Sequence, residues 1–191
     1  MGMCWRGSWM TNPCFACKSM ANQLFLVGYM GAGKTTAANA LSLRTGLPMI
    51  DLDEELERRA GCSIAALFDQ DGETAFRTKE SDLLLQIAGN AALPIVACGG
   101  GIMGNSTNVR TMQTHGHVVW IDPPFEVILE RLRANPGGRP LLATMGDPFD
   151  EEVLRAHFAE RQSGYAKSDE RIRDLSEEVL AALADRISRG G

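Results

Sequence analysis

No apolar run in this chain of 191 residues approaches the ~20 residues that a membrane-spanning helix requires. Basic residues are not in excess, because 19 Lys and Arg stand against 24 Asp and Glu and leave a net charge of −5. A protein that coats nucleic acid needs a basic surface to neutralise phosphates, so this balance argues against that class. We therefore expect one soluble globular domain with neither a membrane nor a nucleic-acid partner.

Cysteine and histidine are few and scattered. The five cysteines form an odd set with no secretory apolar segment, which argues against a disulfide framework and favours a reducing cytoplasm. The three histidines, His115, His117 and His157, share no metal-ligand spacing. We expect them to be structural or solvent-facing, and we expect no zinc.

Residues 1–22 show no clear periodicity and are predicted to be a disordered N-terminal extension of a domain that covers residues 23–191. Cys14 and Cys17 could form half of a zinc site or a redox pair, but no second ligand pair follows at suitable spacing. Two further interpretations stay open. Met20 could be the functional start, or the segment could target an organelle, since no acidic residue precedes Asp51.

A glycine-rich loop carries the clearest motif. The stretch Gly28–Thr35 reads GYMGAGKT, fits GxxxxGK[ST] and directly follows an apolar run at 23–27. In such a loop, backbone N–H groups cradle phosphates, Lys34 neutralises the β- and γ-phosphates, and Thr35 ligates Mg²⁺ where a helix begins. The alternative is a chance turn, which the strand-to-helix context disfavours. The predicted nucleotide contacts are Gly31, Ala32, Gly33, Lys34, Thr35 and Thr36.

Short apolar runs alternate with helical patterns along the domain. We predict strands at 23–27, 47–52, 95–98, 117–121 and 171–175. Helices are predicted at 34–45, 53–60, 63–68, 73–89, 106–115, from 125, at 150–165 and from 176. This order implies an α/β fold, a three-layer P-loop NTPase with a five-stranded parallel sheet and helices on both faces. Residues 134–149 are dense in Pro and Gly and are predicted to be a mobile lid that carries Arg139.

Two carboxylates follow the second predicted strand. Asp51 and Asp53 lie two residues apart, so strand alternation would point both to one side of the sheet edge that holds the glycine-rich loop. One could hold Mg²⁺ and the other could accept a proton from an attacking hydroxyl. The competing interpretation makes Asp53 the N-cap of a helix.

Six motifs occur in the order and spacing of the shikimate kinases, and the chain from residue 22 onward resembles that family of nucleoside monophosphate kinase-like P-loop enzymes. They are GYMGAGKT, Asp51-Leu52-Asp53, Phe76-Arg77-x-x-Glu80, Gly99-Gly100-Gly101, Arg139-Pro140-Leu141-Leu142 and Arg161-x-x-x-Tyr165. The resemblance implies transfer of the ATP γ-phosphate to the 3-hydroxyl of shikimate, on the path to chorismate and the aromatic amino acids. It also implies ATP and Mg²⁺ as cofactors, and we expect a cytoplasmic monomer.

Carried over position by position, the resemblance makes Asp53 the residue that binds the diol and accepts the proton, and Asp51, with Thr35, the support for Mg²⁺. Arg77 and Arg161 match the pair that clamps the carboxylate of shikimate. The backbone of the Gly99, Gly100 and Gly101 triplet would reach substrate oxygens. Arg139 would swing over the transferring phosphoryl group and contact the nucleotide, which makes Asp53, Lys34 and Arg139 the predicted catalytic residues.

Several alternatives stay open at this stage. Arg77 and Glu80 are spaced i, i+3 on one predicted helix and could be only a surface ion pair. Arg161 could be a core-edge side chain. The family's adenine-side arginine maps onto either Arg131 or Arg133. The acceptor could be another small hydroxylated acid, or the chain could be a nucleotide-binding relative without catalysis.

One position departs from the family pattern. The residue two before the glycine triplet, often Ser, is Ala97 here, and Cys98 follows it. Mg²⁺ would therefore depend more on Thr35, Asp51, phosphate oxygens and water. We expect Cys98 to be a buried apolar residue.

Overall fold

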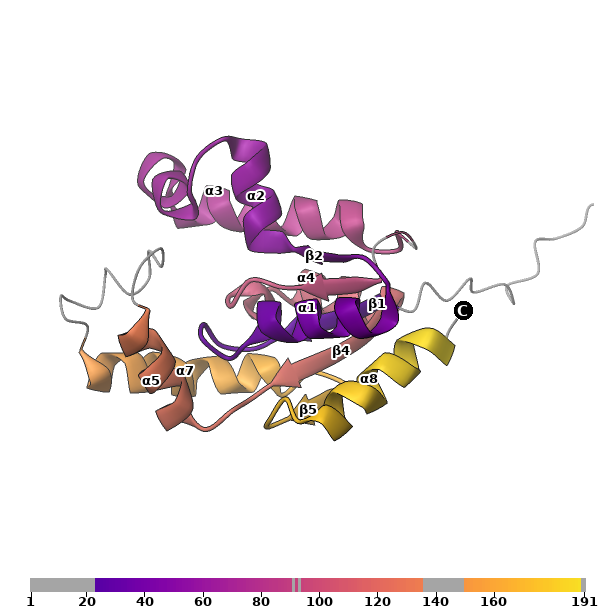
Figure 1. Ribbon diagram of the computed structural model, residues 1–191. Coiled ribbons are helices and arrows are strands. Elements are labelled where there is room, and N and C mark those ends of the chain that lie inside the picture. The colour runs from indigo at the N-terminus through magenta and orange to yellow at the C-terminus, as the bar shows by residue number, and fades with distance from the viewer. Residues whose placement is uncertain (1–22, 91, 93, 136–149, 190–191) are drawn as a thin grey trace, which may run out of the picture.

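A five-stranded parallel sheet forms the centre of the molecule, as a computed structural model shows for residues 23–90, 92, 94–135 and 150–189 (Figure 1). The strand order is β2-β3-β1-β4-β5, and all four pairings are parallel. This confirms the predicted sheet. The strands are β1 (Gln23–Val27), β2 (Met49–Asp51), β3 (Ile95–Ala97), β4 (Gly116–Ile121) and β5 (Glu170–Ile172).

Helices connect successive strands, as the right-handed crossovers of a parallel sheet require. They are α1 (Lys34–Thr45), α2 (Leu52–Ala60), α3 (Ile64–Ile87), α4 (Ser106–His115), α5 (Phe125–Ala134), α7 (Glu151–Tyr165) and α8 (Glu177–Arg189), with a short 3₁₀-helix η1 at Ile102–Gly104.

Side chains of β1 alternate between two apolar layers. Leu24 and Leu26 pack with α1 and α8 on one face of the sheet. Phe25 and Val27 pack on the other face with residues of α2, α3, α4, α5 and α7. All of these strand side chains are almost fully buried. The three-layer α/β/α architecture predicted from the alternating pattern is therefore confirmed.

Glycines end or interrupt two of the helices. Gly46 closes α1 with φ of 71°, a left-handed conformation that glycine adopts at little cost, and its N–H bonds to the carbonyl of Ser42. Gly72 interrupts α3 with φ of 77° and ψ of 169°. The two helices predicted at 63–68 and 73–89 thus form one element with a kink, and Ser63 caps its start.

Two predicted segments lie outside the described residues. These are the N-terminal extension at 1–22 and most of the predicted lid, 136–149, which includes Arg139. The element η1 was not predicted, because its glycine-rich surroundings resemble a loop in sequence. Within the part of the chain that the structure describes, none of the helices is long and apolar enough to cross a membrane.

Candidate active site

A cavity of about 260 Å³ opens beyond the carboxyl ends of β1, β2 and β3. Ligands of open parallel sheets bind at this edge. Most of the predicted site residues reach the cavity, although they come from elements far apart in the sequence. Those that line it are Gly31, Lys34, Thr35, Asp51, Asp53, Arg77, Gly100, Gly101 and Arg161.

The glycine-rich loop leads from β1 into α1. Gly28, Gly31 and Gly33 all have positive φ, and a Cβ on Gly28 would lie 2.4 Å from the carbonyl oxygen of Ile121. Glycine is therefore required there both for conformation and for space. The ammonium group of Lys34 donates to the carbonyls of Gly28 and Tyr29, each at 3.0 Å.

The other predicted nucleotide contacts lie within this loop or directly after it. Ala32 is buried, Gly33 immediately precedes α1, and Thr36 is exposed in the first turn of that helix. The helix N-terminus carries unpaired N–H groups and a partial positive charge, so the loop and helix together suit an anion such as a polyphosphate.

Asp51 connects the loop to the second strand. Its Oδ2 accepts a hydrogen bond of 2.6 Å from the hydroxyl of Thr35. Its Oδ1 accepts from the backbone N–H of Asp53 at 2.9 Å and of Glu54 at 3.4 Å, which makes it the N-cap of α2. The N-cap interpretation of Asp53 is therefore wrong, because Asp51 fills that position.

Asp53 reaches the cavity from the first turn of α2. Strand alternation, the predicted reason for its direction, does not apply, because β2 ends at Asp51. Burial raises the pKa of Asp53 to about 6, and the nearby ammonium of Lys34 opposes that rise. A carboxylate with such a pKa can take up a proton near neutral pH.

Thr35 and Asp51 offer hard oxygen donors beside the loop. Mg²⁺ prefers such oxygens and usually binds through one or two carboxylates together with phosphate and water. No group of three or more His, Cys, Asp or Glu side chains in the described ranges is placed to hold a metal. The donor set therefore fits Mg²⁺ delivered with a nucleotide, and it does not fit a site made of protein ligands alone.

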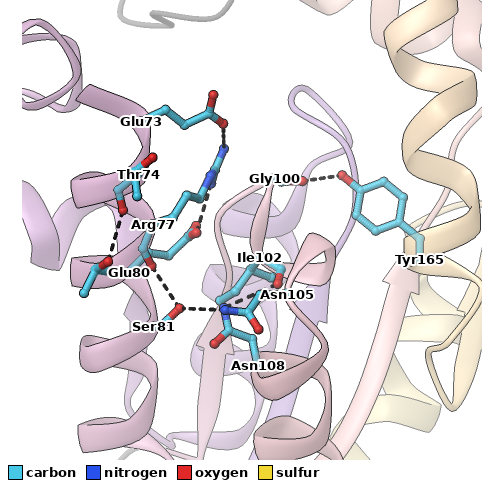
Figure 2. A network of polar contacts seen from close by, with 11 residues as sticks. Glu73, Thr74, Arg77, Glu80, Ser81, Gly100, Ile102, Asn105, Asn108 and Tyr165 are labelled. Atoms are coloured by element: carbon cyan, nitrogen blue, oxygen red, sulfur yellow. Dashed lines mark hydrogen bonds and ion pairs between the residues drawn. The ribbon is translucent and has the colours of Figure 1, made fainter.

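Arg77 projects into the cavity from α3, held by acidic partners (Figure 2). Its Nη1 donates to Oε2 of Glu80 at 2.9 Å, and its Nη2 donates to Glu73 at 3.4 Å. The side chain of Glu80 is only 1% exposed. The alternative of a surface ion pair is therefore wrong, because one partner is buried.

Glu80 keeps one oxygen without a partner among the described residues. Its Oε1 is buried and makes no hydrogen bond. A Cβ on Gly99 would lie 2.5 Å from that oxygen and 2.8 Å from Oδ1 of Asp53. Burial raises the pKa of Glu80, with Arg77 acting in the opposite direction. Two carboxyl groups from α2 and α3 thus converge beside Gly99.

The rest of the glycine triplet packs against other site side chains. A Cβ on Gly101 would lie 2.3 Å from Nη1 of Arg77. Gly100 accepts a hydrogen bond of 2.5 Å from the hydroxyl of Tyr165, visible in Figure 2. None of the three has a positive φ. Gly99 and Gly101 are therefore needed for close approach of side chains, whereas a Cβ on Gly100 would meet only backbone atoms at 3.5 Å or more. Backbone conformation does not require glycine at any of the three positions.

Arg161 lines the same cavity from α7. Its Nε donates to Nε2 of His157 at 3.3 Å. The guanidinium groups of Arg77 and Arg161 therefore reach one space from two different helices. This arrangement suits a planar anion such as a carboxylate.

Arg131 and Arg133 differ in their contacts. Nη1 of Arg131 donates to the carbonyls of Gly31 and Ala32, at 3.1 and 3.0 Å. Arg133 pairs instead with Glu151 at 2.8 Å, and most of its side chain is exposed. Of the two candidates, Arg131 is the one that touches the phosphate loop.

The departure from the family pattern lies inside the fold. Ala97 is buried in β3 and aligns with Asp51 of β2. Cys98 is also buried, as predicted, although it reaches the cavity lining. Burial raises the pKa of its thiol well above the usual value, which makes the thiol a poor nucleophile.

Two hydrogen-bonded residues of the cavity wall were given no role in the site from the sequence. Tyr29 and His157 both line the cavity, and the Tyr29 hydroxyl lies 2.6 Å from Nδ1 of His157. His157 was expected to be structural or solvent-facing, and the structure places it, half-buried, in the cavity wall. One signal was available, because His157 precedes Arg161 by four residues and must share its helix face.

Comparisons with known proteins agree with this geometry. The family model described as shikimate kinase matches residues 30–189. A curated shikimate kinase from Synechococcus sp. (strain JA-3-3Ab) is 38% identical over 164 residues, which cover 86% of this chain and 84% of that protein. The solved shikimate kinase from Acinetobacter baumannii in complex with shikimate aligns with a TM-score of 0.75 and 32% identity, over 88% of this chain and 91% of that one. A shikimate kinase structure from Bacteroides thetaiotaomicron aligns with a TM-score of 0.76, at 27% identity and over 88% and 97% of the two chains.

Proposed function

The chain belongs to the shikimate kinase family, and from this we propose how its cavity carries out the transfer of the ATP γ-phosphate to the 3-hydroxyl of shikimate. The products of this family's reaction are 3-phosphoshikimate and ADP, on the route to aromatic amino acids. The observation that carries the proposal is the meeting of Lys34, Asp53 and two arginine side chains in one cavity.

The phosphate loop would hold ATP. Lys34 bonds to loop carbonyls in the present structure, and we propose that its ammonium group turns to the β- and γ-phosphates when ATP binds. Gly31 and Gly33 would offer backbone N–H groups, and Thr36 would add its own from the first turn of α1. The N–H of Ala32 donates to the carbonyl of Tyr29 at 3.1 Å in this structure and would contact the phosphates once that bond opens. Arg131 would support the loop from its outer side.

Thr35 and Asp51 would hold Mg²⁺. The hydrogen bond between them brings both oxygens together at the first turn of α1, which supports this assignment. When bound, Mg²⁺ supplies positive charge that neutralises the phosphate oxygens. Asp51 also caps α2, so one side chain orients both the metal site and the helix that carries Asp53.

Arg77 and Arg161 would clamp the carboxylate of shikimate. Each charge-assisted hydrogen bond to a carboxylate contributes about 1.5–3 kcal/mol. Glu80 and Glu73 already orient Arg77, so little side-chain entropy remains to be lost on binding. The backbone of Gly99, Gly100 and Gly101 would contact the substrate between the two arginines.

With the carboxylate fixed, Asp53 would accept the proton of the 3-hydroxyl as that oxygen bonds to the γ-phosphorus and ADP leaves. A pKa of about 6 leaves Asp53 mostly ionised at pH 7 and still basic enough for this role. Arg139, which lies outside the described residues, would stabilise the charge on the transferring phosphoryl group.

A substrate panel tests this assignment. Purified enzyme with Mg-ATP would be offered shikimate, quinate, gluconate and nucleoside monophosphates in a coupled assay for ADP. We expect release of ADP with shikimate well above that with the others. Preference for another hydroxylated acid would reassign the acceptor, and no stimulated release with any of them would indicate a nucleotide-binding relative without catalysis.

We also propose the setting in which the enzyme works. The acidic net charge and the small size are consistent with a cytoplasmic monomer that binds neither nucleic acid nor membrane. The catalytic domain would cover residues 23–191, preceded by an extension, with a lid at about 134–149. Light scattering of the purified protein tests the monomer, and a variant that begins at Met20 tests whether activity needs the extension.

A further inference from the structure

We propose that His157 is a positioning residue for shikimate: its neutral ring holds Arg161 in place and ties it to the phosphate loop, and protonation of that ring releases Arg161. This rests on the proposed role of Arg161 as a carboxylate ligand. It assigns a function to a histidine that otherwise has none in the reaction.

Three side chains form a continuous chain of polar contacts along the cavity wall. Nε of Arg161 donates to Nε2 of His157 at 3.3 Å, and the Nδ1 atom of the same ring lies 2.6 Å from the hydroxyl oxygen of Tyr29. All three line the cavity. His157 therefore bridges a residue of the phosphate loop and a substrate arginine of α7.

The bonds fix the tautomer of His157. Nε of Arg161 always carries a proton, so Nε2 of the histidine must be the acceptor. A neutral ring then carries its single proton on Nδ1 and donates it to the hydroxyl oxygen of Tyr29. In this tautomer both ring nitrogens are satisfied, and the hydrogen of the Tyr29 hydroxyl remains free to donate elsewhere.

Packing fixes Tyr29, at one end of this series of polar contacts. Tyr29 is only 2% exposed, and its ring meets the edge of Phe158 at a centroid distance of 5.2 Å. Its backbone carbonyl also accepts from Lys34. The guanidinium of Arg161, in contrast, is anchored through Nε to His157, and its side chain lines the cavity. His157 thus links the long and otherwise flexible side chain of Arg161 to the fixed phosphate loop.

Protonation of His157 would break this arrangement. A second proton on Nε2 removes the acceptor and places two positive charges side by side. The charged groups that face the ring are Arg161 and Glu160 of α7 and Arg77 and Glu73 of α3, with Tyr29 on the loop. Burial lowers the pKa of His157, as do the two arginines, while the two glutamates oppose them. The ring is therefore neutral at pH 7 and loses its hold on Arg161 only in acid.

Two substitutions separate positioning from titration. His157→Leu fills similar space but cannot accept from Arg161. His157→Gln can accept from Arg161 and donate to Tyr29, and it does not titrate. Glu152→Gln, an exposed position on the same helix, serves as the matched control. The KM for shikimate, the KM for ATP and kcat are measured on the full chain from about pH 5 to pH 8, the range in which histidine titrates.

We expect His157→Leu to raise the KM for shikimate about five- to tenfold at pH 7, because one hydrogen bond is lost. The kcat and the KM for ATP should change less than about twofold. His157→Gln should restore most of the affinity. The ratio of the wild-type KM for shikimate to that of His157→Gln should rise as the pH falls. Asp53 and the substrate titrate equally in both proteins, so the ratio isolates His157.

Two results would overturn the proposal. One is a KM for shikimate in His157→Leu equal to that of wild type and Glu152→Gln. The other is a ratio between wild type and His157→Gln that does not change with pH. If His157→Leu fails to fold in a thermal melt, the pH dependence of that ratio decides alone. Failure of the proposed function is a different result, because the wild type would then show no activity with shikimate.

Discussion

The hydroxyl of Thr35 donates a 2.6 Å hydrogen bond to Oδ2 of Asp51, and this bond joins the first turn of α1 to the end of β2. The other carboxylate oxygen of Asp51 caps α2. A single side chain therefore aligns the proposed Mg²⁺ site with the helix that presents Asp53. The order of the strands, with β3 between β2 and β1, allows this contact across the sheet edge.

Asp51 caps α2 and is proposed to hold Mg²⁺, and a substitution can separate its effect on stability from its effect on metal binding. Asn is as good an N-cap as Asp, so Asp51→Asn should change the melting temperature little. It removes the charge that favours Mg²⁺, and we expect the Mg²⁺ concentration for half-maximal activity to rise at least about tenfold. Titration of activity with Mg²⁺ at saturating ATP measures this. An unchanged Mg²⁺ requirement would remove Asp51 from the metal site.

Removal of the proposed base should affect turnover and spare nucleotide binding. Asp53→Asn can still bond to the 3-hydroxyl but cannot accept its proton, so we expect kcat to fall by about 10²–10⁴. The affinity for ATP, measured by calorimetry, should stay within about twofold, because Asp53 makes no proposed contact with the nucleotide. Turnover close to wild type would mean that positioning, or the phosphate itself as base, suffices.

Substitution of Gly101 should weaken the binding of shikimate more than it lowers the stability of the fold. A Cβ there would lie 2.3 to 2.5 Å from the guanidinium of Arg77, which is the far end of a flexible side chain and can swing away. We expect Gly101→Ala to raise the KM for shikimate several-fold and to lower the free energy of unfolding by less than about 1 kcal/mol. Denaturation in urea and steady-state kinetics give the two numbers. A large loss of stability with an unchanged KM would show that Arg77 does not move.

Glu80 should make stability depend on pH. Its folded-state pKa lies above its ordinary value of 4.5, so the folded protein binds a proton that the unfolded chain releases first. The favourable contribution of Glu80 to the free energy of unfolding is fully present below pH 4.5 and is lost as the pH rises through its folded-state pKa. Gln keeps the shape but does not titrate. The free energy of unfolding of wild type relative to Glu80→Gln should therefore decrease from about pH 4.5 upward, as urea denaturation at several pH values would show. A difference that increases with pH would contradict this.

Most of the fold could be predicted from local patterns in the sequence. The helix from Lys34 to Thr45 and its end at Gly46 followed from composition and from the conformational freedom of glycine. The strands followed from short apolar runs bounded by glycine and proline, and the confirmed family resemblance followed from motif order. These features depend on residues close in sequence, which is why periodicity and turn chemistry could predict them.

The finer points of the site depended on contacts between distant residues. Asp51 and Asp53 are chemically alike, and only the end of β2 decides which one caps α2. Arg77 and Glu80 have the spacing of an ordinary surface ion pair, and Glu80 is buried because α3 packs against α2, α4 and η1. His157 meets Tyr29 across 128 positions of sequence. No local pattern reports such contacts.

The central claim is that Arg77 and Arg161 bind one carboxylate in the cavity that also holds Asp53. Its most direct test is the dissociation constant of shikimate with ADP present, measured by calorimetry for wild type, Arg77→Ala and Arg161→Ala. Arg58→Ala is the control, because Arg58 is exposed and pairs with Glu55 away from the cavity. We predict that each of the first two variants binds shikimate at least about tenfold more weakly and that the control is unchanged. Wild-type affinity in either Arg77→Ala or Arg161→Ala would contradict the account.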